Sequence, residues 1–354
     1  MTRFPPELQQ RVARWCPVDE FLAMMLLNRA SYLNLLASFY KIVVVDSTIQ
    51  FNKLADTILT DRKLAGRTSS LRLLPLGLVV TIPYRYNAVA PDTSVVKKVL
   101  HALPNIKQLI LKLSSSGLEE LFQHGGLSDV PFKLQDFHCK LVTGIFDFLR
   151  HQTTLTFFNV LDGVPLNKEQ MALISAESNR MLPKVRKLIG YWSSVNVFIP
   201  DRPVSCLTVT HFGYKESPEV MASTIFRASA PLIEFMDVRF LPEASSFSGF
   251  VISWMNNLSR AHQSLEKFAL CFKLPIIYVT GTPPSTLNID ADDISSTLQS
   301  FKSLRTIRID VGPSCGPIAP PTLDEPRLME FQFWKQACPS LRFVALFGRV
   351  LCDE

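Results

Sequence analysis

The sequence predicts an α/β repeat protein in which a helix, a break and a strand follow one another many times. Two observations support this prediction. A proline or polar break followed by an apolar, strand-forming run recurs along the chain, for example as LPNIKQLIL at 103–111 and CPSLRFVAL at 338–346. Recurrence at intervals of tens of residues is typical of stacked repeats. Hydrophobic residues make up 47% of the chain and charged residues 19%, which indicates a folded protein with a substantial core.

Residues 1–45 predict three short helices. The first begins at a proline pair, with Pro5 in its first turn and Glu7 near its N-terminal end, and Pro17 stops it. Asp19 is the expected N-cap of the second helix, and the third covers 30–40. Their apolar faces exceed what a unit of about 40 residues buries alone. This segment therefore needs another surface to pack against.

The same segment resembles an F-box. Its opening is FPPEL at 4–8, its middle is DEFL at 19–22 followed by LNR at 27–29, and FYKIVVV at 39–45 is similar to the passage from an F-box into a first strand. The resemblance implies a contact with the Skp adaptor of a cullin-RING (SCF) ubiquitin ligase. The residues that would form this contact are Pro5, Pro6, Leu8, Val12, Trp15, Leu22, Leu26 and Arg29.

A second interpretation of residues 1–45 needs no ligase. Terminal repeats of a stack require a cap that covers their apolar end. The three helices could bury their apolar faces against the first strand of the repeats and do nothing else. The sequence leaves both interpretations open.

Residues 46–354 carry the repeats. The first apolar residues of the expected strands are Leu71, Ile106, Leu134, Leu155, Val185, Val204, Leu232, Leu265, Leu304 and Leu341. The expected helices are 93–102, 117–124, 167–181, 217–228, 247–261, 291–301 and 326–337. Prolines such as Pro183 and Pro339 stand where a helix must stop.

This body resembles irregular leucine-rich repeats of the kind found behind F-boxes, which implies an α/β solenoid. Successive anchors are 19 to 39 residues apart, so the spacing is less regular than in repeats of ~20–29 residues. The asparagine expected shortly after each strand is also missing, for example after Leu111 and Ile309. We expect irregular curvature as a result.

Alternation along each strand predicts which residues form the concave face. Successive side chains of a strand point to opposite sides, so Leu109 and Leu111 belong to the core while Ile110 and, in a later strand, Ala269 join the opposite face. The residues of this face expected to bind a protein substrate are Gln108, Lys112, His138, Lys140, Lys187, Tyr191, Thr208, Thr210, Lys267 and Arg308. Their mixed chemistry is typical of a protein-binding surface.

The sequence offers no persuasive catalytic or metal site. GPSCG at 312–316 matches the serine-nucleophile pattern G-x-S-x-G, but the proline-rich PIAPP that follows cannot form the required helix. Asp290, Asp292 and Asp293 precede a helix and are expected to cap it. Adjacent strand residues such as His138 and Cys139 point to opposite faces. We therefore expect no enzyme, cofactor or metal.

Cysteine usage and charge bear on location and partners. The seven cysteines are scattered without C-x-x-C spacing, which favours reduced thiols in the cytoplasm or nucleus. The apolar run 73–82 contains Pro75 and is too short to span a bilayer. Residues 1–112 hold 15 Lys and Arg against 7 Asp and Glu, but without a basic run or stripe, which argues against nucleic-acid binding.

Two functional hypotheses follow from these patterns. In the favoured one, the chain is the substrate-recruiting adaptor of an SCF ubiquitin ligase and holds an unidentified protein substrate on its concave sheet face. In the alternative, it is a leucine-rich-repeat-like protein-binding scaffold without a ligase connection, and the helical head only caps the solenoid.

Overall fold

The structure is a computed structural model. It describes residues 23, 42–45, 48–60, 70–73, 92–123, 126–142, 144–161, 169, 172, 176, 181–210, 217–240, 247–273, 286–287, 290–312, 322–323 and 325–352. The expected head at 1–45 lies outside these residues except for Ala23 and the strand at 42–45. The chain divides into two compact units, Met1–Leu155 and Thr156–Glu354, called here the N-terminal and C-terminal units.

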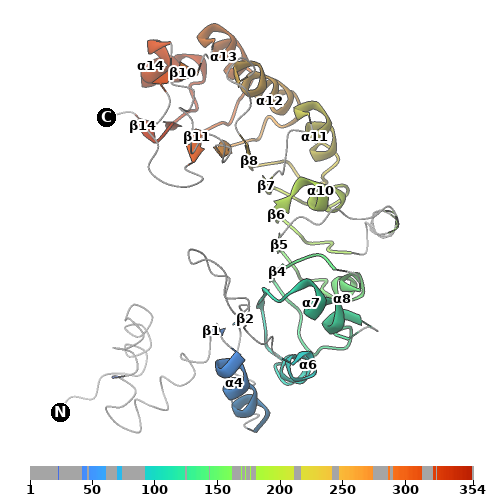
Figure 1. The fold of residues 1–354 in the computed structure, drawn as a ribbon. Coiled ribbons are helices and arrows are strands. Elements are labelled where there is room, and N and C mark those ends of the chain that lie inside the picture. Colours follow the sequence, from blue (N-terminus) through green and yellow to red (C-terminus); the bar gives the residue numbers. More distant parts are fainter. Residues whose placement is uncertain are drawn as a thin grey trace, which may run out of the picture. The chain divides into compact units, whose positions relative to one another are not determined.

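The N-terminal unit is a parallel α/β assembly. Its strands pair in chain order as β1 (Ile42–Val45), β2 (Ser70–Leu73), β3 (Gln108–Leu111) and β4 (Asp136–Cys139). Its helices are α4 (Thr48–Thr60), α6 (Thr93–His101), α7 (Ser115–Phe122) and α8 (Ile145–His151). Each helix packs on the next one in the chain, so the helices form one layer beside the strands (Figure 1). The helix α4 was not among the expected elements.

The C-terminal unit repeats this arrangement over more strands. Its sheet runs in chain order through β5 (Phe157–Val160), β6 (Lys187–Tyr191), β7 (Cys206–Thr210), β8 (Glu234–Phe240), β9 (Lys267–Lys273), β11 (Thr306–Gly312), β13 (Phe343–Leu346) and β14 (Arg349–Cys352). All of these pair in parallel except β14, which is antiparallel to β13. A separate parallel pair joins β10 (Thr286–Leu287) to β12 (Thr322–Leu323).

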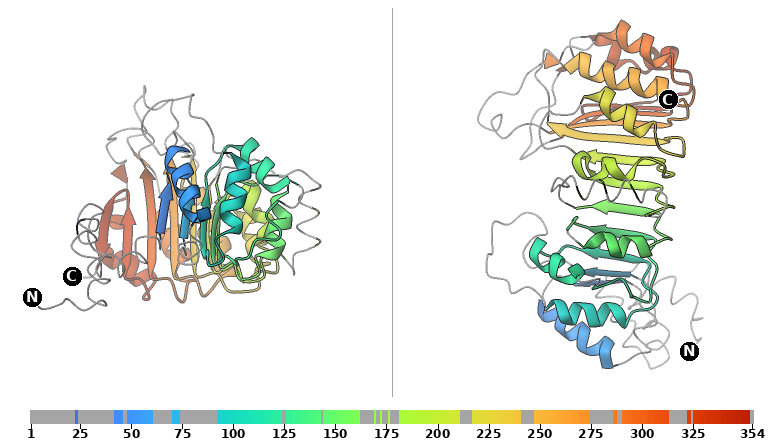
Figure 2. Two further views of the ribbon diagram at one scale, coloured as in Figure 1. Left: turned by 90° about the horizontal axis from the view of Figure 1, so that it is seen from below. Right: turned by 90° about the vertical axis from the view of Figure 1, so that its right-hand side faces the viewer.

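The helices of the C-terminal unit lie on one side of its sheet. They are α10 (Trp192–Val195), α11 (Pro218–Ile225), α12 (Phe247–Ala261), α13 (Ala291–Leu298) and α14 (Phe331–Ala337), with 3-10 turns η2 (Asn196–Phe198) and η5 (Pro326–Met329). The successive helices α11 to α14 pack on one another, and Figure 2 shows them in a single layer along the strands. The α/β class with a mostly parallel, open sheet is therefore confirmed.

Every strand expected from the repeated phrase is present, and the anchor residues explain why. From Ile106 onward each anchor is buried and stands two residues before its strand begins. In the phrase at 338–346, for example, the amide of Leu341 donates to the carbonyl of Cys338 and closes a turn after α14. This turn redirects the chain from the helix layer into the sheet, while the anchor fills the core beneath it.

Hydroxyl groups link some of the turns to the turn before them. Thr154 Oγ1 donates to the carbonyl oxygen of Leu134, an anchor, at 2.7 Å, and Ser340 Oγ donates to the carbonyl oxygen of the anchor Leu304 at 2.8 Å. Both hydroxyl residues directly precede an anchor of their own. These bonds satisfy backbone groups between neighbouring strands at the end where the strands begin, in a fold that lacks the expected asparagines.

A buried ion pair lies between the sheet and the helices of the C-terminal unit. Asp237 and Arg239 occupy the helix-facing side of β8, and Asp237 Oδ2 lies 2.5 Å from the Arg239 guanidinium. The guanidinium also stacks over the ring of Phe250 in α12, 4.4 Å from its centroid. Because both charges are almost completely buried, their pairing is a condition for packing α12 on β8.

None of the helices in the described part of the chain combines the length and the hydropathy that crossing a bilayer requires.

Candidate partner-binding face

The residues expected to bind the adaptor cannot be placed. Pro5, Pro6, Leu8, Val12, Trp15, Leu22, Leu26 and Arg29 all lie outside the described residues. The cysteines Cys16 and Cys315 and most of the GPSCG motif, which begins at the last residue of β11, lie outside them as well.

In the N-terminal unit, the expected face residues gather around one carboxylate. Gln108 Nε2 donates to Asp136 Oδ2 at 2.9 Å, and Asp136 Oδ1 lies 2.8 Å from His138 Nε2. Lys112 and Lys140 follow directly after β3 and β4 and are half-buried. The structure thus brings Gln108 and His138 together through Asp136, a residue that joins two adjacent strands.

The C-terminal unit has a larger face, on the side of the sheet away from the helices. The strand register aligns its side chains in three rows, which together we call the sheet face. The first row is Phe157, Lys187, Cys206, Glu234, Lys267, Thr306 and Phe343; the second is Asn159, Ile189, Thr208, Met236, Ala269, Arg308 and Ala345; the third is Tyr191, Thr210, Val238, Cys271 and Asp310. The expected residues Lys187, Tyr191, Thr208, Thr210, Lys267 and Arg308 all belong to these rows.

Burial distinguishes the two sides of this sheet. Residues that alternate with the rows, such as Leu188, Phe235 and Ile307, are fully buried under the helices. Most residues of the rows are half-buried or exposed. Ala269 and, in the N-terminal unit, Ile110 are buried although we expected both to be exposed on the face. Neighbouring strands are about 4.8 Å apart, so a short side chain, or one between longer side chains on adjacent strands, is shielded from solvent by those neighbours.

Charges on the sheet face occur mainly as pairs. Lys267 and Glu234 are opposite each other on adjacent strands and form an ion pair; the hydrogen bond to Glu234 raises the pKa of Lys267. Arg308 pairs with Asp310 on its own strand, and this hydrogen bond raises the pKa of the guanidinium. Asp310 Oδ1 also accepts a hydrogen bond from the amide of Gly348 at 3.0 Å, which fixes the carboxylate that positions Arg308.

The two cysteines of the sheet face have thiols with raised pKa values. Burial is the main cause that raises the pKa of both thiols, and the nearby Glu234 carboxylate raises that of Cys206 further. A protonated thiol neither attacks carbon centres nor binds metal readily. Of the described cysteines, only Cys139 and Cys338 are fully buried.

Sequence reasoning missed the residues at which the strands begin. Each stands directly after an anchor, and their backbones are linked from strand to strand: the amide of Ser205 donates to the carbonyl of Arg186, and the amide of Arg342 to that of Arg305, both at 2.9 Å. We call these residues the strand-start edge: Thr156, Arg186, Ser205, Ile233, Glu266, Arg305 and Arg342. The recurrence of arginine after the anchors at 185, 304 and 341 was a signal that could have identified them.

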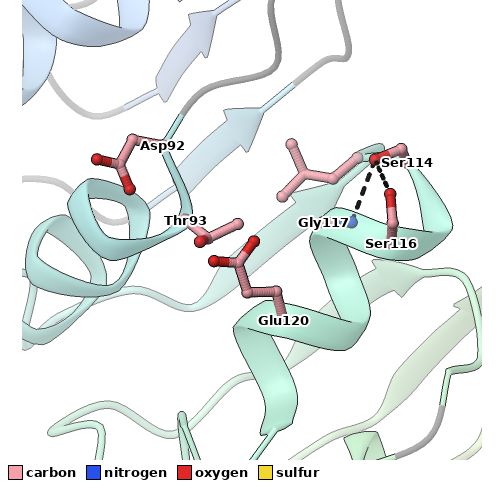
Figure 3. A pocket seen from close by; sticks show the side chains of 7 residues that line it. Asp92, Thr93, Ser114, Ser116, Gly117 and Glu120 are labelled. Atoms are coloured by element: carbon pink, nitrogen blue, oxygen red, sulfur yellow. Dashed lines mark hydrogen bonds between the residues drawn. The ribbon is translucent and has the colours of Figure 1, made fainter.

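A small hollow lies in the N-terminal unit between the starts of α6 and α7. Its volume is about 250 Å³, and Figure 3 shows its lining side chains. Asp92 caps α6 by accepting from the amide of Ser94 at 2.8 Å, and this bond lowers the pKa of Asp92. Ser114 caps α7 through the amide of Gly117 at 3.2 Å. With both caps in place, and the Asp92 and Glu120 carboxylates lining it, the hollow does not suit an anion.

The acidic cluster after residue 289 has the capping role expected of it. The Asp290 side chain accepts from the amides of Asp292 at 2.9 Å and of Asp293 at 3.2 Å at the start of α13. Within the described residues, no group of three or more His, Cys, Asp or Glu side chains is placed to hold a metal ion.

No protein-family model matches this chain, and no curated protein matches its sequence significantly.

Proposed function

We propose that this chain is a protein-recognition subunit whose sheet face binds a protein partner. The observation that carries the proposal is the register of the strands from β5 to β13, which aligns charged, polar and apolar side chains in continuous rows. Among the described residues, no helix packs on that side of the sheet. A face of this kind presents side chains on a rigid backbone, so little freedom is lost when a partner binds.

The dimensions of the sheet face support this proposal. Strands about 4.8 Å apart give a width of about 29 Å from β5 to β13, and the strand-start edge with the three rows extends about 17 Å along the strands. The resulting area is about 500 Å² before side chains are counted, or roughly 60% of the ~800 Å² that one partner contributes to a stable protein interface.

The finer architecture is part of the same proposal. We infer that residues 46–354 form an irregular leucine-rich-repeat-like solenoid, with one strand and usually one helix in each repeat. The order of the strands, the buried anchors and the hydroxyl bonds between successive turns favour this architecture. In such a stack each repeat supplies one strand to a continuous binding surface.

The identity of the complex rests on residues 1–45. The patterns FPPEL, DEFL and LNR favour an F-box-like head that docks on the Skp adaptor through Leu8, Val12, Trp15 and Leu22. The chain would then work as the substrate-recruiting subunit of an SCF ligase in the cytoplasm or nucleus. Its contribution is proximity, because a substrate held near the conjugating enzyme has a high effective concentration.

Co-purification of the full chain with the Skp adaptor tests the ligase proposal. We expect the wild-type chain to retain the adaptor and the Leu8→Asp, Trp15→Ala variant to lose it. The matched control is the Gln9→Ala, Gln10→Ala variant, which changes polar residues of the same segment and should retain the adaptor. If the wild-type chain fails to retain the adaptor, the scaffold alternative replaces the ligase proposal.

Capture of partners by the sheet face is tested separately. Exchange of Tyr191 and Arg308 for Ala is expected to reduce the recovery of proteins cross-linked to the full chain and to leave its melting temperature nearly unchanged. Tyr191 and Arg308 stand in the third and second rows of the sheet face. A large drop in melting temperature would instead show that these side chains support the fold.

A further inference from the structure

The strand-start edge and the sheet face of the C-terminal unit carry an excess of positive charge. Every described carboxylate of these two groups has a basic partner: Glu234 pairs with Lys267, Glu266 with Arg305 and Asp310 with Arg308. The bases Arg186, Lys187 and Arg342 have no carboxylate partner among the described residues. All three side chains are exposed, and Lys187 lies over the ring of Phe157 at 4.9 Å.

These three bases stand at two separate places along the edge. Arg186 directly precedes β6, whose first residue is Lys187, and Arg342 directly precedes β13, with β7, β8, β9 and β11 between the two places. Five strand intervals of about 4.8 Å separate the two places by about 24 Å. An extended polypeptide spans this distance with about seven residues, since each adds about 3.4 Å.

An apolar contact point lies between the two basic places. Ile233 belongs to the strand-start edge at β8 and is an exposed large hydrophobic residue, with 37% of its surface accessible. It is two strand intervals from Arg186 and three from Arg342, about 10 Å and about 14 Å. Along the edge, the positive charge of Arg186 is therefore followed by Ser205, the apolar Ile233, the Glu266–Arg305 ion pair and the positive charge of Arg342.

We propose that this edge recognises an extended acidic segment of a protein partner that crosses the strands from β6 to β13. This inference rests on the proposed function and specifies the partner's chemistry. The segment carries one carboxylate group at Arg186 and Lys187, an apolar side chain on Ile233 about three residues later, and a second carboxylate group at Arg342 about seven residues from the first. Charge complementarity decides the orientation of such a segment and increases its rate of association.

The distribution of charge favours a peptide over a nucleic acid. A phosphate backbone carries charge at every nucleotide, and the carboxylates Glu234 and Glu266 would repel it in the middle of the path. Exposed Ile233 also has no counterpart in a phosphate backbone, whereas an apolar side chain of a peptide can cover it.

Fluorescence anisotropy with the full chain and a labelled peptide of about twelve residues tests this inference. The probe has glutamate pairs about seven residues apart with a leucine between them, in a serine and glycine background. One comparison peptide has lysine in place of glutamate, a second has the glutamates adjacent to one another, and a third probe is a single-stranded oligonucleotide. We expect the first peptide to bind most tightly and to weaken as salt is added.

The variant that reports on the site is Arg186→Glu, Arg342→Glu. It should weaken the glutamate peptide at least about tenfold, because each reversal replaces an attraction by a repulsion. The control is Arg260→Glu on α12, which changes an exposed base of the helix layer and should leave binding within about twofold. Ile233→Ser should weaken the binding of the glutamate peptide and leave the binding of the lysine peptide unchanged.

Three results would overturn the inference: tighter binding of the oligonucleotide, equal binding of the two glutamate spacings, or equal loss with Arg260→Glu. Failure of this inference can be distinguished from failure of the proposed function. If cross-linked partners are still recovered from the Arg186→Glu, Arg342→Glu variant but not from the Tyr191→Ala, Arg308→Ala variant, the sheet face binds protein and only the acidic chemistry is wrong. If neither variant changes recovery, both proposals fail.

Discussion

The hydroxyl of Ser340 donates a hydrogen bond to the carbonyl oxygen of Leu304, the anchor of the preceding strand, at a distance of 2.8 Å. Thr154 makes the corresponding bond to Leu134 in the N-terminal unit. Ser303 directly precedes Leu304, as Ser340 precedes Leu341, yet its hydroxyl makes no such bond. The chain thus contains both a bonded and an unbonded serine at the same position of the repeated phrase.

Removal of the Ser340 hydroxyl should therefore destabilise the C-terminal unit. We expect Ser340→Ala to lower the free energy of unfolding by about 1 kcal/mol, because the Leu304 carbonyl loses a donor in a half-buried turn. Urea denaturation followed by circular dichroism measures the change. The matched Ser303→Ala variant should be close to neutral, and equal losses in both variants would show that the bond contributes nothing specific.

Breaking the buried Asp237–Arg239 pair should lower the free energy of unfolding more than replacing both residues by apolar ones. Arg239→Met removes the positive charge that pairs with the buried Asp237 carboxylate beneath α12, and we expect a loss of about 3–5 kcal/mol in the free energy of unfolding. The double variant Asp237→Leu, Arg239→Met removes both charges and should recover part of that loss. Chemical denaturation of the wild-type chain, the single variant and the double variant measures these free energies. A double variant less stable than Arg239→Met would contradict this account.

His262 should make the protein sensitive to mild acid. Its side chain is buried and Nε2 has no hydrogen-bond partner in the described structure, so burial lowers its pKa below the ordinary 6.5. As pH falls through 6.5, the unfolded chain takes up a proton that the folded chain does not, and stability decreases until the lowered pKa is reached. His262→Gln should remove part of this decrease. Gln152 occupies the same place in its own repeat and is fully buried, which makes glutamine a fitting replacement.

Melting temperatures of the wild-type chain and the His262→Gln variant between pH 8 and pH 5 provide the measurement. The melting temperature of the wild-type chain should fall more steeply with decreasing pH than that of the His262→Gln variant. Parallel curves would show that His262 does not titrate in this range.

The Cys206 thiol should react slowly with alkylating reagents at neutral pH. Burial and the Glu234 carboxylate both raise its pKa, so little thiolate is present. Glu234→Gln removes the carboxylate and should accelerate alkylation of Cys206, as followed by mass spectrometry of the peptide that contains it. Exposed Cys352 serves as the internal reference, since it is distant in sequence and should react equally in both proteins. An unchanged rate at Cys206 would contradict the electrostatic account.

Much of the fold could be predicted because its repeats are local. An anchor such as Leu304 or Leu341, with a break before it, specifies where a helix ends and a strand begins, and period-two alternation then assigns sides of the sheet. The rows of the sheet face followed from this rule. They need only the sequence of each strand, since parallel strands with the same phrase align in register.

Other features depend on contacts between distant segments or on unusual backbone angles. The hairpin between β13 and β14 turns at Phe347 and Gly348, both with positive φ (49° and 80°), and a phenylalanine is not a residue that signals such a turn. The amide of Gly348 is held by Asp310, which is 38 residues earlier. That Arg186 and Arg342 have no carboxylate partner within the described part of the chain could be recognised only after the described ion pairs were known.

Site-specific photo-crosslinking tests the central claim, that the sheet face binds a protein partner, most directly. A photoreactive phenylalanine analogue is placed at Thr208, in the middle of the second row, and in a separate protein at Ser296, an exposed residue of α13 in the helix layer. Both proteins are irradiated in cells at equal expression. We predict covalent protein adducts from position 208 that are absent from position 296 and decrease with the Arg308→Ala substitution. Equal adducts from both positions, or adducts from position 296 alone, would contradict the claim.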